Sequence, residues 1–262
     1  MDIRTALGLK PGEMVALVGA GGKTSTAWQL LRLLVRAGER AVFTTTTRIF
    51  EPQQAPLILN PHPDPADIIA ALLASPALFL AAERGEMGAV SMAARSPYPA
   101  RPIKLVGLDP QTITELGRRL PGVTWIVEAD GAKGCMLKAP ADYEPAIPAG
   151  SQRVVVTASL EALGRPLDAP FVHRAEIAAR LLGLEPGTPI TPAMLAALLV
   201  HPHGGLKGVP PGATVIALLT QTGSTPHPQA EESARQIARS RRFSRVVLTN
   251  PHAVQPVLGV LG

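Results

Sequence analysis

Residues 15–26 read Val15-Ala16-Leu17-Val18-Gly19-Ala20-Gly21-Gly22-Lys23-Thr24-Ser25-Thr26. An apolar run closes on glycines and opens into Lys-Thr and a helical pattern, which predicts a strand, a tight turn and a helix. Glycines in the turn let backbone N–H groups converge on an anion because no Cβ obstructs the approach. The helix that follows directs its free N–H groups at the same point. The predicted phosphate-binding loop comprises Gly19, Ala20, Gly21, Gly22, Lys23, Thr24 and Ser25.

Lys23 and Thr24 carry the chemistry of this loop. Lys23 supplies a point charge to the outer phosphates, and the Thr24 hydroxyl is placed to bind a magnesium ion. The loop is short, because the glycine that usually stands six residues before the lysine is Leu17 here. This short form resembles the loop of the murein peptide ligases, which also hold ATP phosphates. The alternative is a glycine-rich turn with an incidental lysine, which the ordered strand, glycines, Lys-Thr and helix disfavour.

Composition limits the class of protein. With 262 residues, 46% of them apolar and 17% charged, the chain is long enough for a large folded α/β domain and is not of a disordered or fibrous type. Cys135 is the single cysteine, so no intrachain disulfide can form and a reducing, cytoplasmic compartment is expected. The longest apolar segment, 68–82, contains Pro76 and is too short for a bilayer, so no membrane partner is expected.

The positive charge of the chain does not indicate a nucleic-acid partner. The net charge is +5, but aromatic residues make up only 3% of the chain. The basic residues are scattered apart from one cluster at 239–245, which is typical of a solvated helix end. A basic surface suits an anionic phosphate substrate equally well.

Strand and helix patterns alternate along the chain, which predicts an α/β protein with a mostly parallel sheet and right-handed crossovers. We expect a P-loop-type three-layer fold with residues 1–262 as a single domain, and an insertion at 51–102 that holds a helix at 65–82 and a hairpin near 87–92. Strands are expected at 14–18, 40–44, 104–108, 153–157, 213–219 and 245–249, and at an apolar run from 123 that ends on acid. Helices are expected at 24–37, 109–119, 175–182, 192–200 and 231–242.

Four threonines and an arginine follow the second expected strand, at 44–48. Hydroxyls at the carboxyl end of a strand lie on the edge where α/β sheets bind ligands, and arginine suits an anion. Threonine also simply favours strands, which is the competing explanation. On the functional interpretation, Thr45, Thr46 and Arg48 contact the substrate.

Glu128 and Asp130 close the apolar run that begins at Val123. Nucleotide-binding folds place the carboxylate that holds magnesium at such a strand end. Glu128 is therefore predicted to hold the metal together with Thr24, while Asp130 shares that task, orients a water or accepts a proton. The alternative is a strand that merely ends in polar residues. Lys23, Glu128 and Asp130 form the predicted catalytic set.

Two further segments are candidates for substrate contacts. The loop at 132–148 is rich in Lys, Gly, Pro and acid, and it supplies Lys133 and Lys138. His173 and Arg174 open a helix, where a basic pair is unfavourable unless an anion is present, although a capping accident explains the pair equally well.

Several other features carry weaker signals. Cys135 is not expected to act as a nucleophile, because nothing beside two lysines would lower its pKa. His201 and His203 lack a third metal ligand. The base-reading Asn-Lys-x-Asp of guanine-specific enzymes is replaced by Thr-Gln-Thr-Gly at 220–223, so the expected cofactors are Mg²⁺ and ATP, with GTP not excluded.

Taken together, these segments resemble the YqeC-like family, described as selenium-dependent molybdenum hydroxylase accessory proteins. The matching stretches are 18–24, 44–47, 128–134, 138–140, 144–145, 173–174 and 201–207, in order over nearly the whole chain. The resemblance implies a nucleotide-binding accessory role in maturing molybdenum hydroxylases, with a hydroxylase or its pterin cofactor as partner.

Three hypotheses follow. The first is a cytoplasmic magnesium–nucleotide enzyme that transfers or hydrolyses the γ-phosphate, with Thr45, Lys138, His173 and Arg174 facing the acceptor. The second is a non-catalytic carrier that holds a molybdopterin-type phosphate at the same loop. The third, an ATP-dependent ligase, is disfavoured because the C-terminal portion is short.

Overall fold

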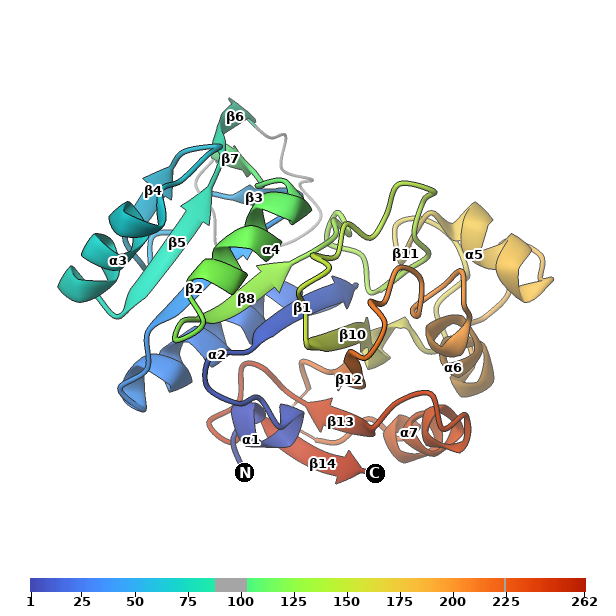
Figure 1. Ribbon diagram of the computed structural model, residues 1–262. Helices are drawn as coiled ribbons and strands as arrows, with labels where there is room; N and C mark the ends of the chain where they lie inside the picture. Colours follow the sequence, from blue (N-terminus) through green and yellow to red (C-terminus); the bar gives the residue numbers. More distant parts are fainter. Residues whose placement is uncertain (88–102, 224) are drawn as a thin grey trace.

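A nine-stranded sheet forms the centre of the computed structural model, which describes residues 1–87, 103–223 and 225–262 (Figure 1). Every neighbouring pair of strands is parallel except the last pair at one edge, which is antiparallel. The strands, in spatial order, are β14 (Val257–Leu261), β13 (Arg245–Thr249), β12 (Thr214–Thr220), β10 (Arg153–Ser159), β1 (Met14–Gly19), β8 (Thr124–Glu128), β2 (Ala41–Thr45), β5 (Ala77–Ala81) and β4 (Leu57–Leu59).

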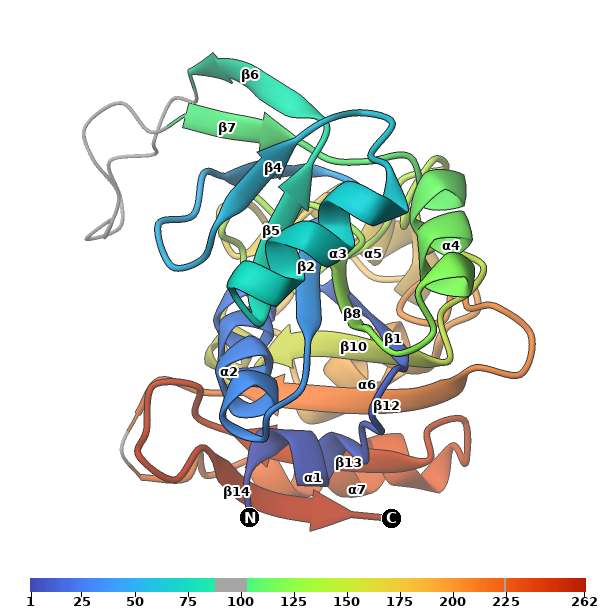
Figure 2. The same ribbon diagram turned by 60° about the vertical axis from the view of Figure 1, so that its left-hand side comes forward.

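Helices cover both faces of this sheet, so the expected three-layer α/β architecture is confirmed (Figure 2). Alternate residues of β1 belong to different cores. Val15 and Leu17 pack in the cluster that includes α1 and α2, whereas Ala16 and Val18 pack in the cluster with the other five helices. A strand buried on both faces needs no polar alternation, which explains its continuous apolar sequence. The helices are α1 (Ile3–Leu7), α2 (Lys23–Arg36), α3 (Pro65–Ala74), α4 (Pro110–Arg119), α5 (Ala175–Leu182), α6 (Pro192–Val200) and α7 (Ala230–Arg239).

Two small sheets flank the large one. The first is antiparallel and consists of β3 (Arg48–Phe50), β7 (Ile103–Val106) and β6 (Glu83–Met87). The second pairs β9 (Leu137–Lys138) in parallel with β11 (Val172–His173), which brings two candidate substrate loops together.

The prediction of a helix at 65–82 is wrong for the second half of that range. α3 begins at Pro65 with Asp64 as its N-cap but ends at Ala74, and Ala77–Ala81 forms the buried strand β5. Pro76 disfavours helix at the residue before it, and the five residues that follow it form an apolar run of strand length. The segment 51–102 therefore supplies β4 and β5 to one edge of the large sheet. That it is an insertion stays a prediction, and most of the expected hairpin near 87–92 lies outside the described residues.

Strand β14 was not expected from the sequence. Its Val-Leu-Gly-Val-Leu sequence pairs antiparallel with β13 and closes one edge of the sheet beside α1. A glycine within five residues weakens the strand signal, because glycine is depleted in strands. In the parts of the chain that the structure describes, no helix has the length and apolar character needed to cross a membrane.

Candidate functional site

The loop between β1 and α2 requires its glycines. Gly19, Gly21 and Gly22 have φ angles of 89°, 75° and 96°, in the left-handed region that favours glycine. A Cβ on Gly19 would lie 2.2 Å from the carbonyl oxygen of Thr157, and one on Gly21 would lie 2.6 Å from the Ser159 Cβ. The loop is thus pressed against the end of β10. A side chain at Gly19 or Gly21 would therefore prevent this close packing of the loop on β10.

Lys23 begins α2 and is buried against Asp130. Its ammonium donates to the Gly19 carbonyl oxygen at 2.5 Å and lies 3.1 Å from the Asp130 Oδ1. The other oxygen of that carboxylate accepts a hydrogen bond of 3.0 Å from the Gly19 amide. Asp130 therefore contacts both the lysine and a backbone amide of the loop, the two kinds of group that a phosphate would use.

Thr24 and Glu128 meet where β8 runs beside β1. The Thr24 hydroxyl donates to the Glu128 Oε2 at 2.8 Å. Burial raises the pKa of the Glu128 carboxyl, and the nearby Lys23 charge opposes this shift. A hydroxyl and a carboxyl oxygen side by side are the ligand types that Mg²⁺ prefers, so the residues present fit the expected metal.

Lys138 extends this cluster away from the loop. Its ammonium lies 3.2 Å from the Asp130 Oδ2 and 2.8 Å from the Glu144 Oε2, and it donates to the Gly131 carbonyl oxygen at 2.5 Å. Glu144 in turn pairs with Arg174 at 2.5 Å. A row of alternating charges thus runs Lys23, Asp130, Lys138, Glu144, Arg174. Lys138, which the sequence predicts as an acceptor contact, is buried among protein oxygens.

The threonine run supports Glu128 from the neighbouring strand β2. The Thr45 hydroxyl donates to the Glu128 carbonyl oxygen at 2.8 Å, and the Thr46 amide donates to the same oxygen at 3.0 Å. Thr45 is fully buried, whereas the buried Thr46 hydroxyl has no hydrogen-bond partner within the described residues. Arg48 is exposed on β3. Their predicted substrate contacts stay predictions.

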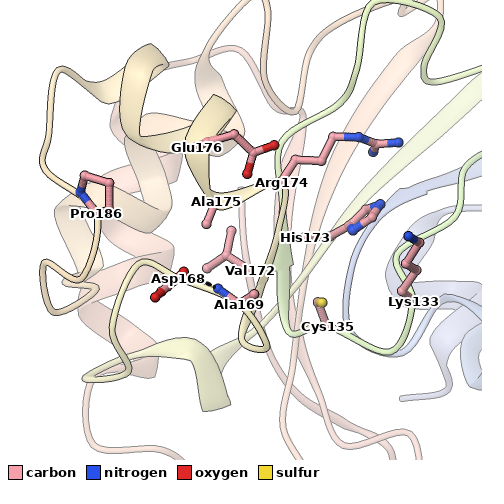
Figure 3. Close-up of a pocket in the computed structure, with 10 residues that line it drawn as sticks. All are labelled: Lys133, Cys135, Asp168, Ala169, Val172, His173, Arg174, Ala175, Glu176 and Pro186. Carbon is pink, nitrogen blue, oxygen red and sulfur yellow. Dashed lines mark hydrogen bonds between the residues drawn. The ribbon is translucent and has the colours of Figure 1, made fainter. Parts of the chain in front are cut away.

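A cavity of about 430 Å³ lies beside β11 and the start of α5 (Figure 3). It unites Lys133, His173 and Arg174, three of the predicted substrate residues, with Cys135. Figure 3 shows Lys133, His173 and Cys135 on one side of it and Asp168 on the other. The remaining lining residues are Ala169, Val172, Ala175, Glu176 and Pro186.

His173 and Cys135 are both uncharged at neutral pH. Burial, aided by the Arg174 and Lys138 charges, lowers the pKa of His173 to about 4. Burial raises the pKa of the Cys135 thiol, which disfavours the thiolate that a nucleophile needs. The cavity therefore offers a neutral imidazole with one donor and one acceptor nitrogen.

The predicted residues thus form two neighbouring groups. Lys23, Thr24, Glu128 and Asp130 meet at the glycine loop, with Ser25 in the first turn of α2. Lys133, His173 and Arg174 meet at the cavity. Among the described residues, no cluster of three potential His, Cys, Asp or Glu metal ligands occurs, and His201 and His203 lie apart from any such group.

Two residues of the site were not singled out from the sequence. Glu144 joins the groups by pairing with both Lys138 and Arg174. The sequence indicated no site role for it, although it lies in a loop rich in lysine and proline and in one of the stretches that carry the family resemblance. The Thr220 hydroxyl donates to the Gly21 carbonyl oxygen at 2.9 Å. A threonine at the carboxyl end of a parallel strand could have suggested that role.

Comparison with known proteins gives one family and one close relative. Residues 15–176 match the model of the family described as YqeC protein. The Uncharacterized protein YqeC of Escherichia coli (strain K12) is 35% identical over 204 residues, covering 78% of this chain and 73% of the relative. No solved structure matches the chain. The matched range includes both residue groups described above.

Proposed function

Because the chain belongs to the YqeC family, we propose that it is a nucleotide- and magnesium-dependent accessory protein that acts in the maturation of molybdenum hydroxylases. In this proposal it transfers or hydrolyses the γ-phosphate of ATP. The observation that carries the nucleotide part is the pairing of Thr24 with Glu128 and of Lys23 with Asp130 at the end of β1 and β8. The accessory role comes from the resemblance to the family.

Each residue at the loop has a role that follows from its position. The loop amides and the Lys23 ammonium would bind the phosphates, while Thr24 and Glu128 would hold magnesium through oxygen. Bound magnesium supplies positive charge that offsets the charge of the phosphate oxygens. Asp130 would then orient the attacking group, because phosphoryl transfer depends mainly on placement and charge stabilisation.

The acceptor would occupy the cavity at Lys133, His173 and Arg174. The row of charges from Lys23 to Arg174 joins the loop to the cavity. An acceptor bound there would have to extend along this row to bring its reacting oxygen to the γ-phosphate. Neutral His173 can accept a hydrogen bond from the acceptor.

Calorimetry tests the nucleotide site directly. ATP should bind the full chain, more tightly with magnesium than without it, and Lys23→Met should weaken binding by about 100-fold or more, since a charged contact to phosphate is lost. Lys10→Met is the matched control, because Lys10 is exposed and precedes β1 at the opposite end of the strand. Unchanged affinity in the Lys23 variant would contradict the assignment.

A carrier of a molybdopterin-type phosphate is the second candidate. The observation in its favour is the cavity of about 430 Å³, which has room for an organic ligand. Glu128→Gln separates the two candidates, because an enzyme would lose turnover while a carrier would keep most of its affinity for the phosphate ligand. Native mass spectrometry of the purified protein would identify a retained nucleotide or pterin.

A further inference from the structure

Asp130 lies between two lysines. One carboxylate oxygen is 3.1 Å from the Lys23 ammonium and the other is 3.2 Å from the Lys138 ammonium. All three side chains are buried, with exposed fractions of 2% for Asp130, 4% for Lys23 and 1% for Lys138. One ammonium group would balance the single negative charge of Asp130. In the structure, two ammonium groups contact it.

Phosphate binding would change this balance. A phosphate at the loop would draw the Lys23 ammonium away from Asp130 and would compete for the Gly19 amide that Asp130 now accepts from. Without another cation, Asp130 would remain as a buried charge with no partner. Such a charge is costly, and the cost would be subtracted from the affinity for the phosphate.

We propose that Lys138 is a positioning residue that holds the charge of Asp130 when Lys23 turns to the phosphate. This inference rests on the proposed nucleotide site. Lys138 acts through Asp130 and touches no ligand, which replaces the acceptor contact expected from the sequence.

The surroundings of Lys138 suit this role. Its side chain is fixed by the Gly131 carbonyl oxygen and by Glu144, and Glu144 shares its own charge with Arg174. The positive charge of Lys138 is therefore available to Asp130. Lys138 and Asp130 also border a space of about 20 Å³, close to that of one water molecule.

The test is ATP binding by calorimetry, with magnesium, on the full chain. Lys138→Met should weaken ATP binding by about tenfold, although Lys138 makes no contact with phosphate. In an Asp130→Asn background the same substitution should have no effect, because asparagine needs no counter-ion. Lys10→Met serves again as the control for the loss of one exposed positive charge.

The outcomes separate the two proposals. If wild type binds ATP and K138M binds it equally well, the role of Lys138 is overturned while the nucleotide site stands. If Asp130→Asn and the Asp130→Asn/Lys138→Met pair differ by more than about threefold, the role is also overturned, and this comparison holds even if K138M alone does not fold. Absence of ATP binding in wild type would overturn the nucleotide site itself.

Discussion

Glu128 and Asp130 are two buried carboxyl groups with different neighbours. Asp130 is in contact with two ammonium groups, whereas the Glu128 carboxyl accepts a hydrogen bond from the neutral Thr24 hydroxyl. Burial accordingly raises the pKa of Glu128. The two acids thus differ in environment, because Asp130 contacts two ammonium groups while Glu128 pairs with a neutral hydroxyl.

Replacing Glu128 by glutamine should stabilise the folded protein at high pH. The raised pKa means that the folded state binds more protons than the unfolded state above pH 4.5, so wild-type stability falls as the pH rises through the folded pKa. Glutamine keeps an oxygen that accepts from Thr24 but does not ionise. We expect Glu128→Gln to gain about 1 kcal/mol at pH 8 relative to pH 5, measured by urea unfolding. If the unfolding free energies of wild type and Glu128→Gln differ by the same amount at pH 5 and pH 8, the prediction is wrong.

His173 should make the protein sensitive to acid. Its pKa of about 4 in the folded state lies below the usual 6.5, so the unfolded state binds more protons between these values. Stability should therefore fall as the pH drops from 6.5 towards 4. His173→Asn should reduce this loss by about 1 kcal/mol, after allowance for solvent screening of a half-exposed ring. Thermal unfolding of wild type and His173→Asn at pH 7 and pH 5 measures this loss of stability. The same loss in both proteins would refute the prediction.

At the scale of the elements, the β1–α2 unit is the part of the chain whose bounds the sequence predicts best. The expected helix at 24–37 is observed at Lys23–Arg36, and Gly38 follows it with a φ of 77°, as expected for a helix end. The expected strand at 14–18 extends by one residue to Gly19. A loop that is fixed at both ends by regular structure presents its amides in a defined direction.

Alanine at Gly19 should disrupt this unit. The new Cβ would lie 2.2 Å from the Thr157 carbonyl oxygen, and the φ of 89° disfavours any side chain. We expect a loss of about 3 kcal/mol or more in the free energy of unfolding, together with loss of ATP binding. Gly38→Ala is the matched control, since Gly38 has a similar φ and open space around it, and it should cost only about 1 kcal/mol. Similar losses in both variants would exclude the clash as the cause.

For the whole molecule, the strand order places the edge strand β14 away from the central strands that carry the candidate site. β1 and β8 lie in the middle of the sheet, whereas β14 lies at its edge with β13, β12 and β10 between it and the loop. Parallel strands at the centre place the carboxyl ends of β1, β8 and β2 on one edge, where the loop, the acids and the threonines meet. The edge strand can therefore affect the fold without touching the site.

Deletion of residues 257–262 should lower stability and spare nucleotide binding. The truncated chain loses the antiparallel pairing of β14 with β13 and the contacts of β14 with α1 and α7. We expect a loss of about 3 kcal/mol in unfolding free energy from the apolar area exposed, with ATP affinity at 10 °C changed by less than about twofold. Val254→Ser, at a fully exposed apolar residue, is the control. A large loss of affinity would show that the edge and the loop are coupled.

The sequence alone determined the features that depend on neighbours along the chain. Glycines at 19, 21 and 22, an apolar strand before them and Lys23-Thr24 after them specify the loop, because backbone freedom and helix periodicity are local properties. The acids at 128 and 130 were found in the same way, from the end of an apolar run.

Only the tertiary structure decided which charges meet. Lys138 and Glu144 come from a loop without regular pattern, and nothing local to them indicates that they pair with Asp130 and Arg174. The edge strand β14 likewise depended on its pairing with β13 across the sheet. Burial supplies the reason, since a charge removed from water must be matched by whichever opposite charge the fold places beside it.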